Sequence, residues 1–124
     1  MSFTRVHRTN PLLVVLGALM LTSGAALAKS PDCTSPEAWP AAMAFTYLKN
    51  AEVVTNEGLD LKKTTVTRLA SEKVGKDLYR QVHLVRFFRL SGETVKVITM
   101  NDASNEECSM SKVDAYLVSA RLGE

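Results

Sequence analysis

The stretch LYRQVHLVRFFRLSGETVKVITM, Leu78–Met100, decides the fold of this chain of 124 residues. Two runs rich in β-branched and aromatic residues, Leu78–Leu90 and Glu93–Met100, flank the dipeptide Ser91-Gly92. Such a dipeptide between two strand-like runs is typical of a tight hairpin turn. The stretch therefore predicts two antiparallel strands that are neighbours in one sheet.

The longer of these two runs does not alternate cleanly between apolar and polar residues. A strand of this length is usually bent or bulged, and a bulge near Arg86 would bring Phe87 to the same face as Val82 and Leu84. One side of the strand would then be exposed, the side that carries Tyr79, Gln81 and His83.

A helix precedes the hairpin. Ser35-Pro36-Glu37 looks like a helix start, but Pro40 is tolerated only in a first turn. Either Ser35–Trp39 is a separate turn, or the regular helix begins at Pro40, and good helix formers continue to Ala51. The remaining predicted elements are a strand at Lys63–Ser71, a turn at Glu72–Asp77 and a last strand at Lys112–Leu122. This order predicts the α+β class, with one N-terminal helix packed on a four-stranded antiparallel meander sheet and one disulfide.

The first 28 residues have the three-part order of a secretory signal peptide. Arg5 and Arg8 stand in a leading segment without acids, Leu12–Leu21 is an apolar run, and Ala26-Leu27-Ala28 supplies small residues before a cleavage site. A transmembrane anchor would need roughly 20 apolar residues, about twice this run. We therefore expect a mature domain of residues 29–124 that is periplasmic or secreted and has no membrane anchor.

Removal of this leader also removes the basic surplus of the chain. The chain has 15 Lys plus Arg and 13 Asp plus Glu, and Arg5 and Arg8 are the charged residues of the leader, so 13 of each sign remain. Proteins that bind nucleic acid need a surplus of cations to displace counterions. The equal numbers of acidic and basic residues argue against a nucleic-acid partner, although they leave a local basic patch as an alternative.

Both cysteines, Cys33 and Cys108, remain after cleavage. In a small exported domain such a pair predicts one disulfide, with two free thiols or an intermolecular bridge as the alternatives. His83 is the one histidine left, so the four ligands of a closed zinc site are missing. We expect neither a metal nor a cofactor.

Candidate contact residues fall in two places. The long strand offers Tyr79, Arg80 and His83. A polar loop at Asn101–Ser111, pinned at Cys108, offers acidic residues, and loops on a rigid scaffold often carry contacts. These acids are Asp102, Glu106 and Glu107.

Each of these candidates has a plainer interpretation. Arg80, Arg86 and Arg89 could form a solvated face paired across strands with Glu93 or Asp114 instead of an anion site. A general base at His83 would need a nucleophile and an orienting partner, which the sequence does not supply. The acidic loop lacks the spacing of a calcium loop.

The order of helix, antiparallel sheet and a bridge between the two ends resembles that of the colicin M immunity proteins and a periplasmic relative. The helix-and-sheet order is also similar to that of the cystatins. The cystatin inhibitory motif Gln-x-Val-x-Gly is not met, because the segment from Gln81 to Val85 lacks the glycine. These resemblances cover the mature chain and concern layout, which does not by itself give function.

A small exported domain with one disulfide, no net charge and no catalytic set of residues is typical of a protein that works by contact with another protein. We therefore expect a protein-binding module of the inhibitor or immunity type, not an enzyme, whose partner is another protein in the envelope or outside the cell. The alternative is a small-ligand carrier or envelope accessory protein, with a pocket under Trp39, Met43 and Tyr47.

Overall fold

A computed structural model describes residues 30–120, 122 and 123. The signal peptide predicted at residues 1–28, and the predicted first mature residue Lys29, lie outside the described residues. The elements are helix α1 (Trp39–Asn50), a short 3₁₀ helix (Leu61–Lys63), and strands β1 (Thr65–Gly75), β2 (Leu78–Phe88), β3 (Thr94–Ala103) and β4 (Asp114–Val118).

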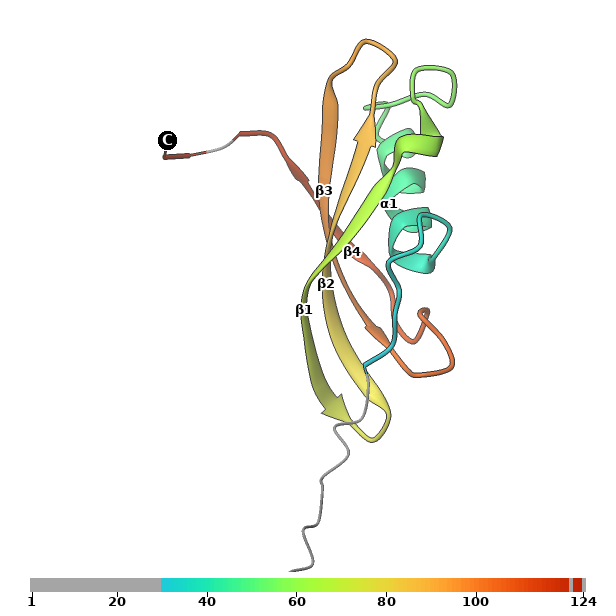
Figure 1. Cartoon of the computed structure of the whole chain (residues 1–124), viewed down its shortest axis with the longest axis vertical. Coiled ribbons are helices and arrows are strands. Elements are labelled where there is room, and N and C mark those ends of the chain that lie inside the picture. The colour runs from blue at the N-terminus through green and yellow to red at the C-terminus, as the bar shows by residue number, and fades with distance from the viewer. Residues whose placement is uncertain (1–29, 121, 124) are drawn as a thin grey trace, which may run out of the picture.

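The four strands form one antiparallel sheet in the order β1-β2-β3-β4. Helix α1 lies over β2 and β3 on one face of this twisted sheet (Figure 1). We call the face under α1 the inner face and the opposite one the outer face. The predicted α+β architecture, with its helix and four-stranded meander, is confirmed.

Helix α1 begins at Trp39, so that Pro40 falls in its first turn. Ser35 to Ala38 form a separate turn, in which the Ala38 amide donates to the Ser35 carbonyl at 3.0 Å. The structure lies between the two predicted alternatives: the separate turn is present but ends at Ala38, and the helix begins one residue before Pro40. Proline is tolerated at this place because its missing N–H would have had no partner within the helix.

The core forms where the small residues of α1 meet the branched and aromatic residues of the sheet. Ala41, Ala44 and Leu48 are buried, and they pack with Val85, Phe87, Val95 and Val97. The Phe45 ring lies 6.0 Å from the Phe87 ring. Trp39, at the start of the helix, is 38% exposed, and its indole N–H donates to the Ser111 carbonyl.

Strand β2 is regular, which contradicts the predicted bulge near Arg86. Its register with β3 is unbroken from Tyr79 opposite Ala103 to Phe88 opposite Thr94. The irregularities lie instead in β1, between Arg68 and Ala70 and near Gly75. An edge strand has one neighbour, so it can take up a bulge at a smaller cost in hydrogen bonds than a central strand.

The strand ends also differ from prediction. Strand β1 continues through the predicted turn as far as Gly75, and the turn itself is short, with Asp77 at φ 48°. Strand β3 continues past Met100 to Ala103, and β4 is shorter than the predicted strand. The hairpin at Ser91-Gly92 is confirmed, and Gly92 adopts φ 96°, which favours glycine.

Candidate binding surface

Two of the predicted contact residues are buried. Tyr79 is 4% exposed and His83 fully buried, because the regular β2 turns both to the inner face together with Gln81, Val85 and Phe87. The expected exposure of Tyr79, Gln81 and His83 was wrong. These residues belong to the core, and the residues of β2 that alternate with them form the outer face.

The inner face near the disulfide is polar. Gln81 donates to the Pro31 carbonyl at 2.9 Å and to the Ser71 hydroxyl at 3.1 Å. Asn101, which pairs with Gln81 across the strands, donates to the Cys108 carbonyl at 2.7 Å. These bonds join the sheet to the segments on either side of the disulfide.

His83 lies opposite Thr99 in this polar region, and neither ring nitrogen has a hydrogen-bond partner among the described residues. Burial lowers the pKa of His83, the nearby charge of Arg68 lowers it further, and Asp32 opposes them. The ring is therefore held in its neutral form, inside the core.

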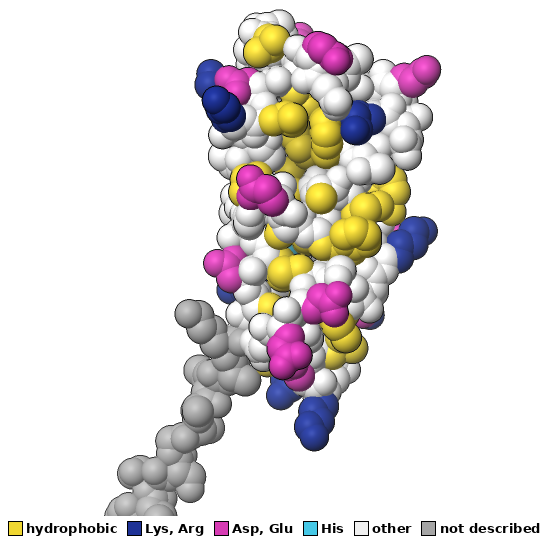
Figure 2. All heavy atoms as spheres, turned by 90° about the vertical axis from the view of Figure 1, so that its right-hand side faces the viewer, with side chains coloured by type: hydrophobic (Ala, Val, Ile, Leu, Met, Phe, Trp, Pro, Cys, Tyr) yellow, Lys and Arg dark blue, Asp and Glu magenta, His cyan; other side chains and the backbone are white. Residues whose placement is uncertain are grey.

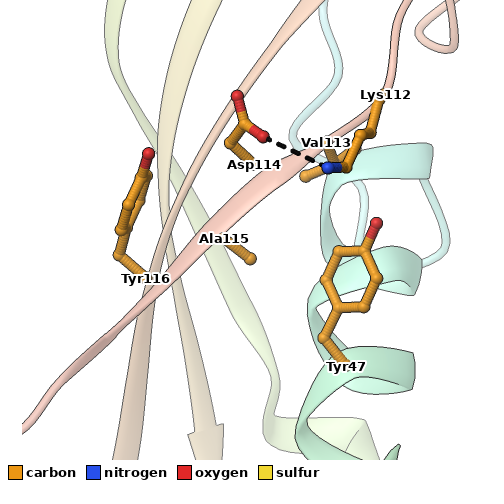
Figure 3. Close-up of a pocket in the computed structure, with 6 residues that line it drawn as sticks. All are labelled: Tyr47, Lys112, Val113, Asp114, Ala115 and Tyr116. Carbon is orange, nitrogen blue, oxygen red and sulfur yellow. Dashed lines mark ion pairs between the residues drawn. The ribbon is translucent and has the colours of Figure 1, made fainter.

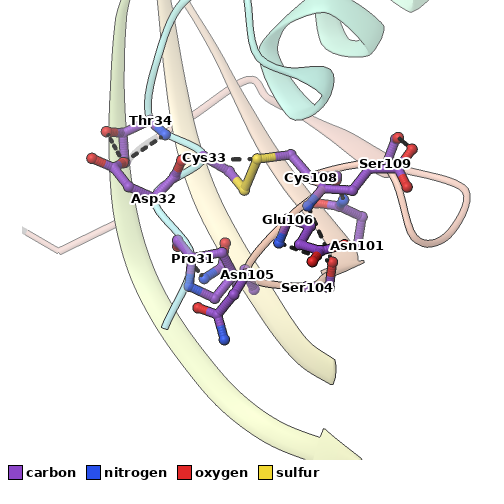
Figure 4. The surroundings of a disulfide bond; sticks show 12 residues. Pro31, Asp32, Cys33, Thr34, Asn101, Ser104, Asn105, Glu106, Cys108 and Ser109 are labelled. Atoms are coloured by element: carbon purple, nitrogen blue, oxygen red, sulfur yellow. Dashed lines mark hydrogen bonds between the residues drawn. A yellow bond between two sulfur atoms is a disulfide. The ribbon is translucent and has the colours of Figure 1, made fainter. Parts of the chain in front are cut away.

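The disulfide between Cys33 and Cys108 is confirmed, with 5.8 Å between the two Cα atoms. It ties the N-terminal segment to the loop that follows β3 (Figure 4). Cys33 is fully buried, so the bridge forms part of the cover over the polar region.

The loop that carries Glu106 and Glu107 is held by hydrogen bonds within itself and to the turn between β1 and β2. The Ser104 amide donates to the Glu107 carbonyl at 2.8 Å, and the Asn105 side chain donates to Asp77 at 2.7 Å. Both glutamates are exposed. The stapled loop thus presents two acids to solvent on a fixed backbone.

Arg80 and Asp102 meet on the outer face. They are opposite one another in β2 and β3, and Nε of Arg80 lies 3.1 Å from Oδ1 of Asp102. The hydrogen bond and charge of Asp102 raise the pKa of Arg80, and Glu72 on the neighbouring strand adds to this. Arg89 pairs with Glu93 at 3.7 Å, as the solvated-face alternative anticipated.

An apolar band crosses the middle of the outer face. It consists of the half-buried Val82, Leu84, Ile98 and Met100 and the exposed Tyr116. Leu84, Ile98 and Tyr116 form one cross-strand row. Arg86 and Lys96, opposite one another, flank the band at one end. No helix or strand of the described residues covers this band (Figure 1).

The opposite side of the molecule also carries apolar side chains. Figure 2 shows them running along the helix side between scattered charged residues. Trp39 of α1, Leu61 of the 3₁₀ helix and Met110 of the loop after β3 are among the exposed apolar residues.

Strand β4 is an edge of the sheet and has exposed apolar residues on both of its faces. Tyr116 is 59% exposed, Leu117 50% and Val118 37%. We call Asp114–Val118 the β4 edge. Sequence reasoning predicted this strand but overlooked it as a surface. Three consecutive apolar residues near the end of the last strand were the available signal, since an exposed run of this kind usually has a function.

A shallow groove separates the β4 edge from α1. Tyr47 of α1 faces Val113 and Ala115 of the β4 segment, and Lys112 pairs with Asp114 at 3.9 Å (Figure 3). The pocket they line has a volume of about 280 Å³. An adjoining apolar pocket of about 160 Å³ lies between Tyr47, Leu48, Ala115 and Leu117.

No protein-family model, curated protein or solved structure matches this chain. Within the described residues, no helix is long and apolar enough to cross a membrane. Residues 30–120, 122 and 123 also contain no group of three or more His, Cys, Asp or Glu side chains that could hold a metal ion.

Proposed function

We propose that this protein is a small exported binding module that acts by contact with another protein, as inhibitors and immunity proteins do. The observation that carries the proposal is the apolar band on the outer face. Small soluble proteins seldom leave contiguous apolar surface uncovered unless it binds something. Here the band is continuous with the β4 edge, so the two form one surface.

The surroundings of the band suit a protein partner. Interfaces commonly combine an apolar centre with a polar rim, and the charged rim mainly sets the association rate and the orientation of the partner. Arg86 and Lys96 at one end, and Arg80 with Asp102 at the other, provide such a rim. The disulfide is in keeping with export into an oxidising compartment.

The size of the apolar pockets favours a protein over a small ligand. The pockets beside α1 measure about 160, 250 and 280 Å³. Sites for small molecules usually measure roughly 300–1,000 Å³ and enclose most of the ligand. The carrier alternative therefore has less support than the contact surface.

The test is capture of a partner with the purified protein as bait, from an envelope extract and from culture medium. Leu84→Lys places a charge in the centre of the band, and Leu90→Lys places the same charge on the hairpin, where the leucine is 69% exposed. We expect a retained protein whose affinity falls at least tenfold for Leu84→Lys and stays unchanged for Leu90→Lys, with thermal melting recorded for both. Retention of no protein, or equal retention by both variants, would refute the proposal.

A further inference from the structure

The two edges of the sheet are built differently. Strand β1 has two register shifts and carries Arg68, Glu72 and Lys73. Bulges and charges of this kind protect an edge against pairing with another chain. Strand β4 pairs with β3 without a register shift, and Asp114 is the one charged residue in Asp114–Val118. The β4 edge thus lacks the protection that β1 has.

We propose that the β4 edge pairs antiparallel with the β4 edge of a second copy of this chain, around a two-fold axis at Leu117. The sheet then continues from one copy into the other. The side chains that this arrangement brings together lie at the edge, from Asp114 to Ala120, and all of them are exposed except the half-buried Ala115. The proposal does not depend on the proposed function.

The side chains of the edge complement themselves in this register. Leu117 lies opposite Leu117 of the second copy on the inner face. Tyr116 lies opposite Val118 twice on the outer face, and aromatic pairs with β-branched residues stabilise antiparallel strands. Asp114 lies opposite Ala120, so no charge opposes a like charge.

Charge selects this register over its neighbours. A pairing centred on Asp114 would set the two carboxylates directly opposite one another, which destabilises a sheet. A pairing centred on Tyr116 would set Asp114 against Val118, a charge against a branched apolar side chain. The Leu117-centred register alone among these three keeps the apolar residues together and leaves Asp114 at the rim.

The groove beside α1 supports the same arrangement. Leu117 lines the apolar pocket of about 160 Å³ together with Leu48, Val97 and Ala115. Leu117 of the second copy comes to lie beside it and covers the mouth of that pocket. A two-fold axis normal to the sheet also sets both outer faces on the same side, so the two apolar bands join into one surface.

The first experiment measures the mass of the purified, oxidised protein over a range of concentrations, by sedimentation equilibrium and light scattering. We expect a reversible monomer–dimer equilibrium. Leu117→Lys places two like charges on the axis and should raise the dissociation constant at least tenfold. Leu69→Lys is the matched control, because Leu69 is 52% exposed on the other edge strand, and it should leave the equilibrium unchanged.

A second experiment keeps the test valid if Leu117→Lys lowers stability. Residues directly opposite one another in antiparallel strands have Cα atoms about 4.5–5.5 Å apart, within the range of roughly 4.4–6.8 Å that a disulfide accepts. Leu117→Cys should therefore form an intermolecular bridge on mild oxidation. Val118→Cys should bridge poorly, because its copies are diagonal neighbours about 7–8 Å apart.

Several outcomes would overturn the proposal. One is a wild-type protein that stays monomeric at every concentration. Others are a dimer that Leu117→Lys leaves intact, or equal bridging by the two cysteine variants. A monomer whose captured partner is lost with Leu117→Lys would show that β4 receives a strand of another protein, which refutes the second copy but supports the proposed function.

Discussion

Reduction of the Cys33–Cys108 disulfide should remove a large part of the stability of this domain. The bridge joins residues 75 positions apart. In the chain-entropy treatment, a closed loop of that length destabilises the unfolded state by about 4.5 kcal/mol at 25 °C. Domains of this size have total stabilities of roughly 5–15 kcal/mol, so the oxidised protein would lose between about a third and nearly all of its stability.

The loss of stability on reduction should be uneven across the sheet. The Pro31 carbonyl, two residues before Cys33, accepts hydrogen bonds from both Gln81 and Arg68. Once the bridge is open, this segment keeps those bonds and its burial but loses its covalent tie to the loop that follows β3. We therefore expect amide hydrogen exchange to increase first around Gln81 and His83, and later around Val85 and Phe87, which α1 covers.

The assay is thermal melting of the oxidised protein and of the same protein in a phosphine reductant. A change of 1 kcal/mol shifts the melting temperature of a domain of this size by about 4–8 °C, so reduction should lower it by roughly 20–35 °C. The double variant Cys33→Ala/Cys108→Ala is the control, because reductant should not change its melting. A shift below about 5 °C for the wild type, or uniform exchange across β2, would refute the reasoning.

Further predictions concern the buried polar region and the two charged sites. Because burial lowers the pKa of His83 below its ordinary value of 6.5, the unfolded chain takes up a proton at a higher pH than the folded one. The contribution of His83 to stability is therefore complete above pH 6.5 and is lost as the pH falls from 6.5 through the pKa of the folded state. His83→Gln should make the melting temperature less dependent on pH over this window. An unchanged pH dependence would contradict the lowered pKa of His83. Thr99→Val should leave stability equal or slightly higher, because the buried hydroxyl has no hydrogen-bond partner among the described residues. Asn101→Ala removes the donor to Cys108 and should cost about 1–3 kcal/mol in urea unfolding. Tyr79→Ala should destabilise by about 3–5 kcal/mol, as truncation of a buried aromatic residue does, while Arg80→Ala, its exposed neighbour, should leave melting nearly unchanged; similar melting of the two variants would contradict the assigned faces. Charge reversal of Glu106 and Glu107 should change the association rate of a captured partner more than its dissociation rate, and surface plasmon resonance at rising salt should show the effect fade.

The architecture could be predicted because it depends on local signals. Ser91-Gly92 fixed the central hairpin, Pro40 fixed the start of the helix, and the two cysteines allowed one intrachain bridge. Which face of β2 is buried could not be predicted, because polar residues such as Gln81 and His83 are normally expected to be exposed. The burial of Gln81 depends on Pro31, which lies 50 residues away in the sequence and supplies a hydrogen-bond acceptor.

The candidate surface could be predicted only in part, because the exposure of its residues also depends on contacts between distant segments. Arg80 and Asp102 were identified as candidates, and they do meet on the outer face. Tyr116 and Leu117 were assigned to a strand, but a sequence does not show which strand of a sheet has a free edge. The exposure of Leu117 follows from the strand order and from the position of α1 over β2 and β3.

The lengths of the elements explain why the disulfide stands where it does. A helix of 12 residues such as α1 is about 18 Å long, whereas a strand of 11 residues such as β2 extends over about 36 Å. The helix can therefore cover about half of the inner face, the half with Val85 and Phe87. The other half needs a second cover, and the segment held by Cys33 provides it.

That second cover supplies backbone acceptors, which accounts for the polar side chains of the sheet beneath it. Backbone carbonyls such as those of Pro31 and Cys108 accept hydrogen bonds, so the buried amide N–H groups of Gln81 and Asn101 have partners there. An apolar inner face would have left these carbonyls without partners. The redox and pH dependence predicted for this protein should consequently arise in the same half of the domain, away from α1 and from the Leu117 axis of the β4 edge.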